Sequence, residues 1–494
     1  MKHTRTLAAI LAALLLMPSL ASCANDDESA DTRETQNNNH ETQNDELKDS
    51  LPENLNYGGD KIVFISDFPN EIFSEKLTSD PVNDIVFERN KAVEQRLNVN
   101  ITCFSDNTAN IIDKVVTSIN GGSADYDVVD AKCWTAAPKT IDGFFSDLKN
   151  TAYLDFDKIW WNKSFNDAIS YHDAQYAVTG AMVLSLYRRT YTTVFNKAMF
   201  TDAGQKYLYE YVDNGTWTLD KQASLVPLFY VDNGDQVQDL TNDIFGFVSN
   251  DFISVDPYWA ACGVDIIKKN ADGDYEWVFD TNRMHDMADK VLNLFYATDG
   301  GAYIETDNTI SEDVVLSAFS GSRAAMATMV IQGLESSEMR QMTDEYGVVP
   351  IPKYDETQTT YRSQMHDGFS IVCIPTTVQG EKLDKVSAVL EAMAATSYKL
   401  VRPVYYETTL RTKIAQDPQS SAMMDLIINN IYIDPGFVFS AAIGTMDGSF
   451  HQSFQDLIAS KTNDTASRFK TAAKSAKNGM NKIVLKLNNL TEKD

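Results

Sequence analysis

The chain shows two kinds of hydrophobic periodicity from about residue 57 onward. Short apolar runs such as "KIVFIS" (61–66) predict strands, and "NDIVFERNKAVEQRLN" (83–98) places apolar residues at helical spacing. Strand-like "VNITCF", helix-like "IIDKVVTSINGG" and strand-like "YDVVDAKC" follow in that order. Strands that alternate with amphipathic helices are typical of α/β architecture, so the pattern predicts a β-α-β-α-β beginning.

The first residues have a different pattern, in which positive charges precede an apolar run. Lys2 and Arg5 come before residues 7–17, which are too few to span a bilayer and have the layout of a secretory signal. The sequence "LASC" at 20–23 is similar to the lipobox of bacterial lipoproteins. This resemblance implies a signal peptide over residues 1–22 and a lipid on Cys23, at the extracellular face of the cell membrane. A chance cysteine within the signal peptide is the alternative.

The segment after the cysteine is polar. Residues 24–56 contain no aromatic side chain and too little apolar surface to offset the entropy lost on ordering. We therefore expect residues 23–56 to be a lipidated, disordered tether and the folded body to begin at residue 57. About 435 residues exceed what one hydrophobic core usually holds, so we expect two lobes.

The charge balance excludes one class of partner. The formal charge is −28, and loss of residues 1–22 removes Lys2 and Arg5 with no acidic residue, which gives −28 − 2 = −30. A nucleic-acid partner is not expected for so acidic a chain.

No pattern in the sequence points to a metal or a cofactor. The six histidines never stand at i, i+4, and neither GxGxxG nor GxxxxGK[ST] follows a predicted strand. Apart from the lipidation candidate, the cysteines are far apart and mostly within apolar runs: Cys103, Cys133, Cys262 and Cys373. Buried free thiols are expected, and one disulfide stays open as an alternative.

Several longer stretches resemble one family, the extracellular solute-binding lipoproteins of bacterial ABC importers, especially the sugar-binding group that includes maltose-binding protein. They occur in the family's order over almost the whole body: "RNKAVEQRLNVNI", "GGSADYDVVD", "FFSDLKN", "TTVFNKAMF", "YVDNGTWTLDK", "YGVVPIPKYDETQTTYRSQMHDGFSIVCIP" and "LRTKIAQDPQSSAMMDLI". The insertion "DNGDQVQDLTNDIFG" departs from the best-known members.

The resemblance implies an α/β, two-lobed periplasmic-binding-protein-like fold of type II, with a ligand cleft between the lobes. It implies three crossings of the chain, near Gly180, Phe369 and Leu410. The first lobe is then expected to contain residues 57–180 and 371–409. The second lobe is expected to contain residues 181–370 and 410–494.

Sugar sites combine aromatic faces with hydrogen-bonding side chains, because sugars have apolar C–H faces rimmed by hydroxyls. Trp134 follows a predicted strand, where the family's first lobe reaches the cleft, although a tryptophan there can also cap the strand end. Pro257 is expected to open a helix that presents Tyr258 and Trp259 to the ligand, with plain packing as the alternative.

Other candidates come from positions where the family has a polar rim or further rings. Asp67, Gln332 and Asp367 match the hydrogen-bonding rim, while Tyr187 and Phe437 match positions near the cleft. Arg188 or Arg189 is expected beside Tyr187, but only one of them, because adjacent residues on a strand face opposite sides. A solvated surface is the alternative for the three polar residues.

The pair Trp160-Trp161 is the most unusual local feature, since the chain has only six tryptophans. If Asp157 begins a helix, Trp161 shares a face with Phe165 and belongs to the core, whereas Trp160 lies on the polar side. Trp160 is therefore a candidate for the cleft rim, although its position favours a structural role.

These observations favour a non-enzymatic, membrane-anchored and monomeric receptor. It is expected to capture a sugar or oligosaccharide by hinge closure and to deliver this ligand to an ABC permease. A binding protein for a peptide, a polyamine or another solute is the first alternative, because a fold does not fix its ligand. A surface glycoside hydrolase is the second, but it needs two carboxylates about 5–10 Å apart, and no spacing singles out such a pair.

Overall fold

The computed structural model describes residues 48–106, 108, 110–407, 417–444 and 448–492. Residues 49–494 form one compact unit, and residues 1–48 form a separate one, of which only Lys48 is described. The predicted signal peptide, Cys23 and most of the predicted tether lie outside the described residues. No helix in the described ranges is long and apolar enough to cross a membrane.

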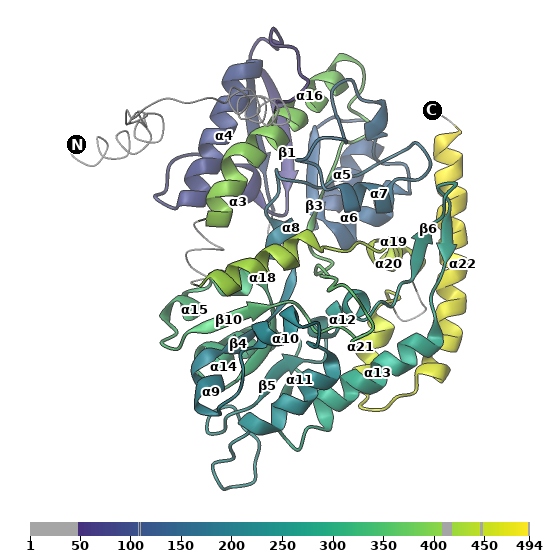
Figure 1. The fold of residues 1–494 in the computed structure, drawn as a ribbon. Helices are drawn as coiled ribbons and strands as arrows, with labels where there is room; N and C mark the ends of the chain where they lie inside the picture. The colour runs from purple at the N-terminus through teal and green to yellow at the C-terminus, as the bar shows by residue number, and fades with distance from the viewer. Residues whose placement is uncertain (1–47, 107, 109, 408–416, 445–447, 493–494) are drawn as a thin grey trace, which may run out of the picture. The chain divides into compact units, whose positions relative to one another are not determined.

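The first sheet has the order β11-β3-β1-β2 (Figure 1) and is formed by β1 (Asp60–Ser66), β2 (Val99–Phe104), β3 (Val128–Lys132) and β11 (Ser370–Cys373). β1 pairs in parallel with β2 and β3, which confirms the β-α-β-α-β beginning, while β11 is antiparallel to β3. The helices on and around this sheet are α3 (Pro69–Ile72), α4 (Pro81–Leu97), α5 (Ile111–Asn120), α6 (Cys133–Thr140), α7 (Lys163–Ile169) and α16 (Glu381–Thr396). We call this half the first lobe.

Local sequence signals explain the boundaries of α4. The Asp80 carboxylate accepts hydrogen bonds from the N–H groups of Val82 and Asn83, and Pro81 occupies the first helical position, where no N–H is needed. Asn98 ends the helix in a left-handed conformation, with φ 49°. The chain then enters β2 directly, which places Val99 beside Asp60 of β1.

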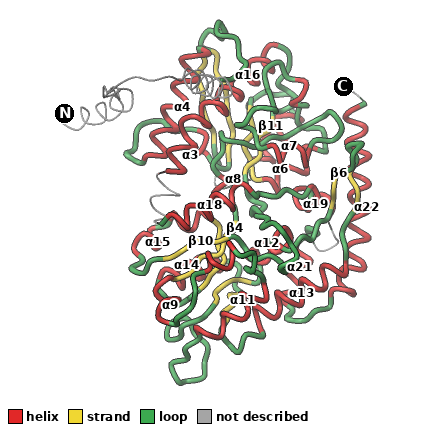
Figure 2. The backbone as a smooth tube through the Cα atoms, in the orientation of Figure 1, coloured by secondary structure: helices red, strands yellow, loops and turns green. Residues whose placement is uncertain are grey.

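The second sheet has the order β10-β4-β9-β5-β8, with β4 (Tyr191–Asn196), β5 (Phe247–Asn250), β8 (Ala302–Glu305), β9 (Met326–Val330) and β10 (Tyr346–Val349). Figure 2 shows these strands between two groups of helices. The helices of this second lobe are α9 (Lys197–Asp202), α10 (Leu208–Asp213), α11 (Leu219–Leu225), α12 (Pro257–Ala261), α13 (Thr281–Tyr296), α14 (Ser311–Ser320), α15 (Ser337–Gln341) and α18 (Pro418–Asn429).

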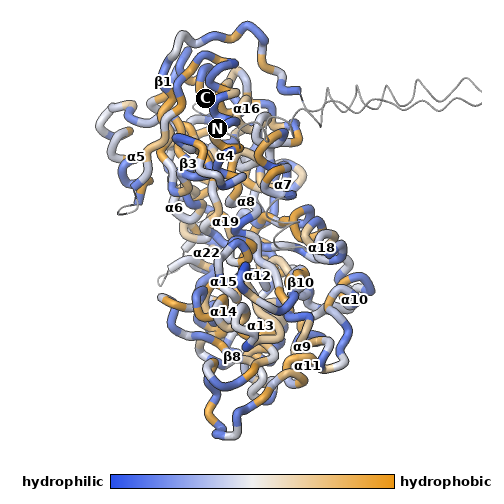
Figure 3. The backbone as a smooth tube through the Cα atoms, turned by 90° about the vertical axis from the view of Figure 1, so that its left-hand side faces the viewer, coloured by the Kyte–Doolittle hydropathy of each residue, from blue (hydrophilic) through white to orange (hydrophobic). Residues whose placement is uncertain are grey.

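Alternate residues of the second sheet belong to different hydrophobic cores. Val194 and Ala327 pack in the core that includes Phe319 of α14, whereas Phe195 and Met326 belong to the core that includes Tyr258 of α12. Along the helices, hydrophobic and hydrophilic stretches alternate, as expected for elements that bury one side (Figure 3). Because both faces of this sheet are buried, the polar groups of a site are expected at the ends of its strands.

The last part of the chain lies against both lobes. It contains α19 (Pro435–Val438), α20 (Ser440–Ile443), α21 (Gln452–Ala459) and α22 (Thr465–Thr491). α20 contacts α6 of the first lobe, and α22 contacts α13 of the second. α22 also contacts β7 (Tyr275–Trp277), which pairs with β6 (Ile267–Lys269) in a small hairpin.

The chain passes between the two sheets in defined places. Val178 still bridges to Val372 of β11, and Tyr191 begins β4, so the first passage lies between these residues. The next passage lies between the end of β10 and the start of β11. The third expected crossing, near Leu410, lies outside the described residues.

Gly180 occupies a place in the first passage where only glycine fits. A Cβ atom at this position would lie 2.3 Å from the backbone oxygen of Trp160 and 3.1 Å from the Cα atom of Trp161. Because real Cβ atoms essentially never come within 3.0 Å of another heavy atom, the approach to the Trp160 oxygen means that a side chain here would force the two bridged segments apart. The close approach holds the Trp160-Trp161 segment against the passage between the lobes.

Two local predictions were wrong. α7 begins at Lys163, with Asn162 as its N-cap, so Asp157 does not start a helix. The folded body also begins before residue 57: Leu51 is buried, and the Asp49 carboxylate pairs with the Arg96 guanidinium at 2.5 Å. The four described cysteines are free thiols, and all except Cys103 are buried.

Candidate ligand-binding site

Three strand ends lie side by side in the first sheet. They are the carboxyl ends of β1 and β3 and the amino end of β11. Asp67 follows β1, Trp134 lies in the first turn of α6, and Asp367 lies shortly before β11. The Asp67 carboxylate accepts a hydrogen bond from the Lys132 backbone N–H (2.9 Å), and the Trp134 N–H donates to the Asp367 carbonyl (3.2 Å). The structure thus brings these three predicted residues together, with Trp134 47% exposed.

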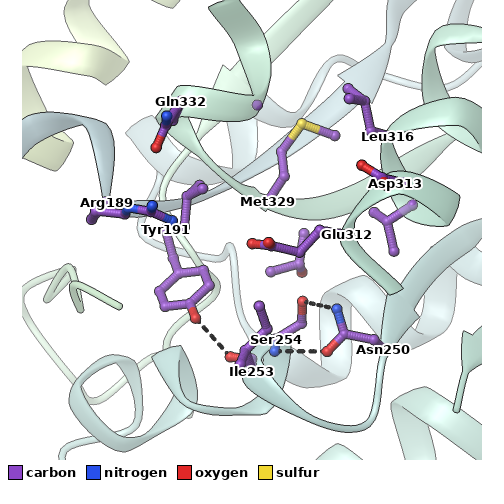
Figure 4. A pocket seen from close by; sticks show the side chains of 14 residues that line it. Arg189, Tyr191, Asn250, Ile253, Ser254, Glu312, Asp313, Leu316, Met329 and Gln332 are labelled. Carbon is purple, nitrogen blue, oxygen red and sulfur yellow. Dashed lines mark hydrogen bonds between the residues drawn. The ribbon is translucent and has the colours of Figure 1, made fainter. Parts of the chain in front are cut away.

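A pocket of about 260 Å³ lies at the strand ends of the second sheet (Figure 4). Its walls come from the amino end of β4, the carboxyl ends of β5 and β9 with the turns that follow them, and the beginning of α14. The polar side chains that we use below are Arg189, Tyr191, Asn250, Ser254, Glu312 and Gln332. Crevices beyond strand ends are the usual ligand sites of α/β sheets.

One wall of this pocket is fixed by its own hydrogen bonds. The Asn250 amide nitrogen donates to Ser254 Oγ (2.9 Å), and its oxygen accepts from the Ser254 N–H (3.0 Å). The Tyr191 hydroxyl donates to the carbonyl of Ile253 at 2.9 Å, as Figure 4 also shows. The turn after β5 is therefore tied both to itself and to β4, which gives the pocket a rigid floor.

Opposite charges face each other across the pocket. Figure 4 shows Arg189 beside Tyr191, with Glu312 and Asp313 from the first turn of α14 across from them. Among the described residues, no group accepts a hydrogen bond from the buried Nε of Arg189. A ligand with both donors and acceptors, such as a polyol, is suited to walls of this kind.

Next to the pocket, a buried polar cluster connects three distant segments. The ring of His366 lies beside that of Tyr191, with centroids 6.1 Å apart, and His366 Nδ1 lies 3.1 Å from the Asp367 carboxylate. His451 Nε2 lies 3.8 Å from Asp367 and 4.0 Å from Asp256. Asp256 directly precedes α12 of the second lobe, Asp367 lies shortly before β11 of the first sheet, and His451 directly precedes α21.

Burial and the neighbouring charges in this cluster shift the pKa values of Asp367, Asp256 and His451. Burial raises the pKa of Asp367, but hydrogen bonding to His366 and the charges of His366 and His451 outweigh it, so the pKa lies below its ordinary value. Burial, and then the charge of Asp367, raise the pKa of Asp256 well above its usual range. Burial lowers the pKa of His451 to about 4, so this imidazole is neutral at neutral pH.

Tyr258 and Trp259 do not project into an open cleft in this structure. Pro257 does begin α12, but Tyr258 and Trp259 are 0% and 2% exposed. Trp259 is surrounded by rings of Phe450, Phe454 and Phe469, with centroids 5.9–6.4 Å away. The expectation failed because the last part of the chain covers α12, so both rings belong to the core.

Three other predicted residues lie outside the pocket lining. Tyr187 stacks on Tyr405 at 6.3 Å, and Phe437 is buried against His451 at 4.9 Å. Trp160 is 1% exposed, and its indole N–H donates to the Glu391 carboxylate at 3.1 Å. The predicted place of Trp160 at the cleft rim was wrong, because its polar partner is a buried glutamate rather than solvent.

Of the predicted residues, Gln332 lines the pocket, as does Arg189, one of two alternatives, and sequence reasoning missed several others. Arg189 was considered only as an alternative to Arg188, on the assumption that both lie on a strand. They lie instead at the end of α8 (Ser185–Arg188), where Arg188 turns away to form ion pairs. Asn250 is the last residue of the buried strand β5, and Glu312 lies in the first turn of α14. Both are common positions for site residues, but nothing in their local sequence distinguishes them.

No group of three or more His, Cys, Asp or Glu side chains in the described part of the chain is arranged to hold a metal ion. The chemistry available at the pocket is hydrogen bonding from Arg189, Asn250, Ser254 and Gln332, with acceptors on Glu312 and Asp313. Such a set of groups suits reversible binding of a polar ligand.

Solved structures of solute-binding proteins have the same fold. The galacto-N-biose-/lacto-N-biose I-binding protein of the ABC transporter from Bifidobacterium longum, in complex with lacto-N-biose, superimposes with a TM-score of 0.57 at 15% identity over 86% of this chain and 98% of that chain. The GacH receptor of Streptomyces glaucescens, studied unliganded and with acarbose, gives a TM-score of 0.55 at 15% identity, with 86% and 98% covered.

A third similar structure, UgpB from Mycobacterium tuberculosis in complex with glycerophosphocholine, has a TM-score of 0.52 at 16% identity and covers 88% of this chain and 100% of that chain. No protein-family model and no curated protein sequence matches this chain. The likeness establishes the fold: it is the two-lobed α/β fold of ABC-transporter solute-binding proteins, as the sequence predicted.

Proposed function

We propose that this protein is the substrate-binding component of an ABC importer and that it binds a sugar or oligosaccharide between its lobes. The observation that carries the proposal is the pocket with opposed Arg189 and Glu312 side chains at the strand ends of the second sheet. Similar structures hold lacto-N-biose and acarbose, which supports a sugar as ligand. The chain is then a binding protein and not an enzyme, and ligand capture occurs by hinge closure.

The side chains at the strand ends of the two sheets support a sugar as the ligand. Arg189 and Gln332 supply donors and Glu312 supplies acceptors, which together satisfy hydroxyl groups that both donate and accept. The exposed ring of Trp134, at the edge of the first sheet, offers a flat surface for the apolar face of a sugar ring. We propose that Trp134, Asp67 and Asp367 complete the site from the first lobe.

The proposal includes the setting in which the protein works. We propose a signal peptide over residues 1–22, a lipid on Cys23 at the outer face of the membrane, and a permease that receives the ligand. Because the compact unit begins at Asp49, the lobe boundaries are proposed as 49–180 with 371–409, and 181–370 with 410–494. The pairing of β11 with β3 supports the return of the chain to the first lobe. A monomer is the proposed state.

A non-sugar solute is the second candidate. The UgpB structure holds glycerophosphocholine, and the pocket has two carboxylates against one guanidinium, which favours a ligand with a cationic group. A thermal-shift screen over neutral sugars, peptides, polyamines and choline esters separates the two candidates, because a ligand that binds only the folded state raises the melting temperature. A response to no neutral sugar, together with a response to a cation, contradicts the sugar proposal.

We expect Arg189→Gln to weaken binding of the ligand found in this screen by about 10- to 100-fold, since a hydrogen bond from a charged donor contributes about 1.5–3 kcal/mol. Isothermal titration calorimetry measures the effect. Arg323→Gln is the matched control, because Arg323 is half-buried near the opposite end of β9, away from the pocket. Equal affinities of the Arg189→Gln variant and the parent mean that the ligand binds elsewhere.

We expect Cys23→Ser to abolish lipid attachment, because only the thiol accepts the diacylglycerol group. Fractionation of cells that express the parent and the variant measures this: the variant is expected in the soluble fraction or the medium. Membrane retention equal to that of the parent contradicts the proposed anchor.

A further inference from the structure

A second cluster of charges lies beside the pocket without lining it. The Arg188 guanidinium forms a two-pronged pair with Glu335, with Nε–Oε1 and Nη2–Oε2 distances of 3.2 and 3.1 Å. Its remaining Nη1 lies 3.1 Å from Oε1 of Glu71. The side chains of Arg188 and Glu335 are 20% and 18% exposed, and that of Glu71 is 5% exposed, so water screens these pairs only weakly.

The two acids come from different lobes. Glu71 belongs to α3, which follows β1 of the first sheet, and its Oε2 accepts from the backbone N–H of Ser185 at 2.7 Å. Glu335 ends the 3-10 helix Ile331–Glu335, which follows β9 of the second sheet. Arg188 therefore joins an element of each lobe, at the place where the chain first passes between them.

Tyr405 adds a second tie to the same glutamate. Its hydroxyl donates to Glu335 Oε1 at 2.6 Å, and the Arg188 guanidinium lies over its ring at 5.4 Å from the centroid. Tyr405 is 1% exposed and follows α17 (Arg402–Val404), which packs against α4 of the first lobe. Glu335 of the second lobe is thus tied to the first-lobe side directly by Tyr405, and through Arg188 to Glu71.

The cluster is directly connected to the walls of the pocket. Arg188 immediately precedes Arg189, and Glu335 ends the 3-10 helix that contains Gln332. Arg189 and Gln332 both line the pocket, but Arg188 and Glu335 do not. A change in the separation of Arg188 and Glu335 must therefore move two pocket walls relative to each other.

Stability alone is a weak reason to keep such a cluster, because buried ion pairs often contribute no more than apolar residues of similar volume. Breaking the cluster is costly, however: burial raises the pKa of Glu71 despite the opposing effects of Arg188 and Ser185, so the Glu71 carboxylate depends on its partners. Ion pairs that are costly to break but add little net stability hold their partners at a defined separation. Here they hold Glu71 of the first lobe and Glu335 of the second.

We infer that Arg188, Glu335 and Tyr405 form an interlobe clasp that sets the lobe angle of the ligand-free protein and thereby positions Arg189 and Gln332. These three are positioning residues, since none of them lines the pocket. The inference rests on the proposed function only in naming Arg189 and Gln332 as ligand contacts. The clasp itself is a property of the chain without any ligand.

The test needs no ligand, so its outcome is independent of whether the proposed function is right. Spin labels are placed at two exposed alanines, Ala92→Cys in α4 and Ala203→Cys after α9, in full-length protein that also carries Cys23→Ser and Cys103→Ser. Electron–electron resonance gives the distribution of interlobe distances. Hydrogen exchange with mass spectrometry reports on the pocket walls at 189–191 and 331–333.

For Glu335→Gln and Arg188→Met we expect a broadened or shifted distance distribution and at least tenfold faster exchange at both pocket walls. Tyr405→Phe removes one tie and is expected to show a smaller change in the same direction, which keeps the test valid if Arg188→Met fails to fold. Arg96→Met is the matched control, because it breaks the two-pronged pair with Asp49 on the first-lobe side alone. Its distance distribution and pocket exchange are expected to equal those of the parent.

The inference is overturned if Glu335→Gln and Tyr405→Phe leave the distance distribution and pocket exchange unchanged while their unfolding free energy falls as in Arg96→Met. The cluster then contributes to stability only. A change in exchange without a change in distance also overturns it, because the clasp is defined by its control of the lobe angle.

Discussion

Trp259→Ala is expected to lower the free energy of unfolding by about 3–5 kcal/mol, the usual cost of removing a fully buried aromatic side chain. The Trp259 ring is 2% exposed and touches Phe454 of α21 and Phe469 of α22, so its loss leaves a cavity between α12 and the last part of the chain. Chemical denaturation followed by circular dichroism measures the midpoint and slope for the variant and the parent.

Trp134→Ala is the matched control, because Trp134 is 47% exposed and contributes little to any core. We expect its stability to stay within about 0.5 kcal/mol of the parent. Retained stability of Trp259→Ala together with lost ligand binding contradicts the core assignment and restores the ligand role predicted from the sequence.

The first lobe was the most predictable part of the molecule because its signals are local. The strands at 60–66, 99–104 and 128–132 and the helices between them each carry their own period and stop signals, such as Gly121-Gly122 after α5. Parallel pairing of such units follows from the right-handed crossover rule. The family resemblance added the two-lobed arrangement, which periodicity cannot supply.

The burial of α12 was not predictable from its own sequence. Pro257 marks the helix start correctly, but a proline before two aromatic residues is compatible with rings that face either a ligand or a core. The Trp259 ring of α12 is buried by Phe450, Phe454 and Phe469, which lie about 190–210 residues later in the chain. No local pattern reports a contact over that separation.

The pocket was predictable only in outline. Gln332 was identified from its resemblance to the family's hydrogen-bonding rim, and Arg189 was one of two candidates. The choice between Arg188 and Arg189 depends on α8 and on Glu335, which together direct Arg188 away from the pocket. Adjacent residues in a helical turn point in directions about 100° apart, so the strand assumption gave the wrong geometry.

The role of the Trp160-Trp161 pair also depends on a residue far away in the sequence. Both indole N–H groups donate to the carboxylate of Glu391 in α16, at 3.1 and 3.0 Å, and the Asp155 N–H lies 3.3 Å from it. Glu391 stands more than 200 residues after the tryptophans, in a helix that otherwise reads as apolar. The tryptophans are adjacent because two donors must reach one buried acid.

This buried acid leads to the last prediction, a pH-dependent stability. Burial raises the pKa of Glu391 from 4.5 to about 7, against the hydrogen bonds from both tryptophans and Asp155. Between these values the folded protein retains a proton that the unfolded chain has lost, so stability falls as pH rises. The group's contribution is complete below about pH 4.5 and lost above about pH 7, a change of about 3 kcal/mol.

Glu391→Gln isolates this contribution, because glutamine has nearly the same shape and does not titrate. Other groups titrate in the same range, among them Asp434, whose pKa burial raises to about 7, so the measured quantity is the difference between parent and variant. Denaturation at pH 5 and pH 8 should show the parent losing about 2–3 kcal/mol more than Glu391→Gln. Equal losses in the two proteins would show that Glu391 is already ionised at pH 5, held in that state by the two indole N–H groups.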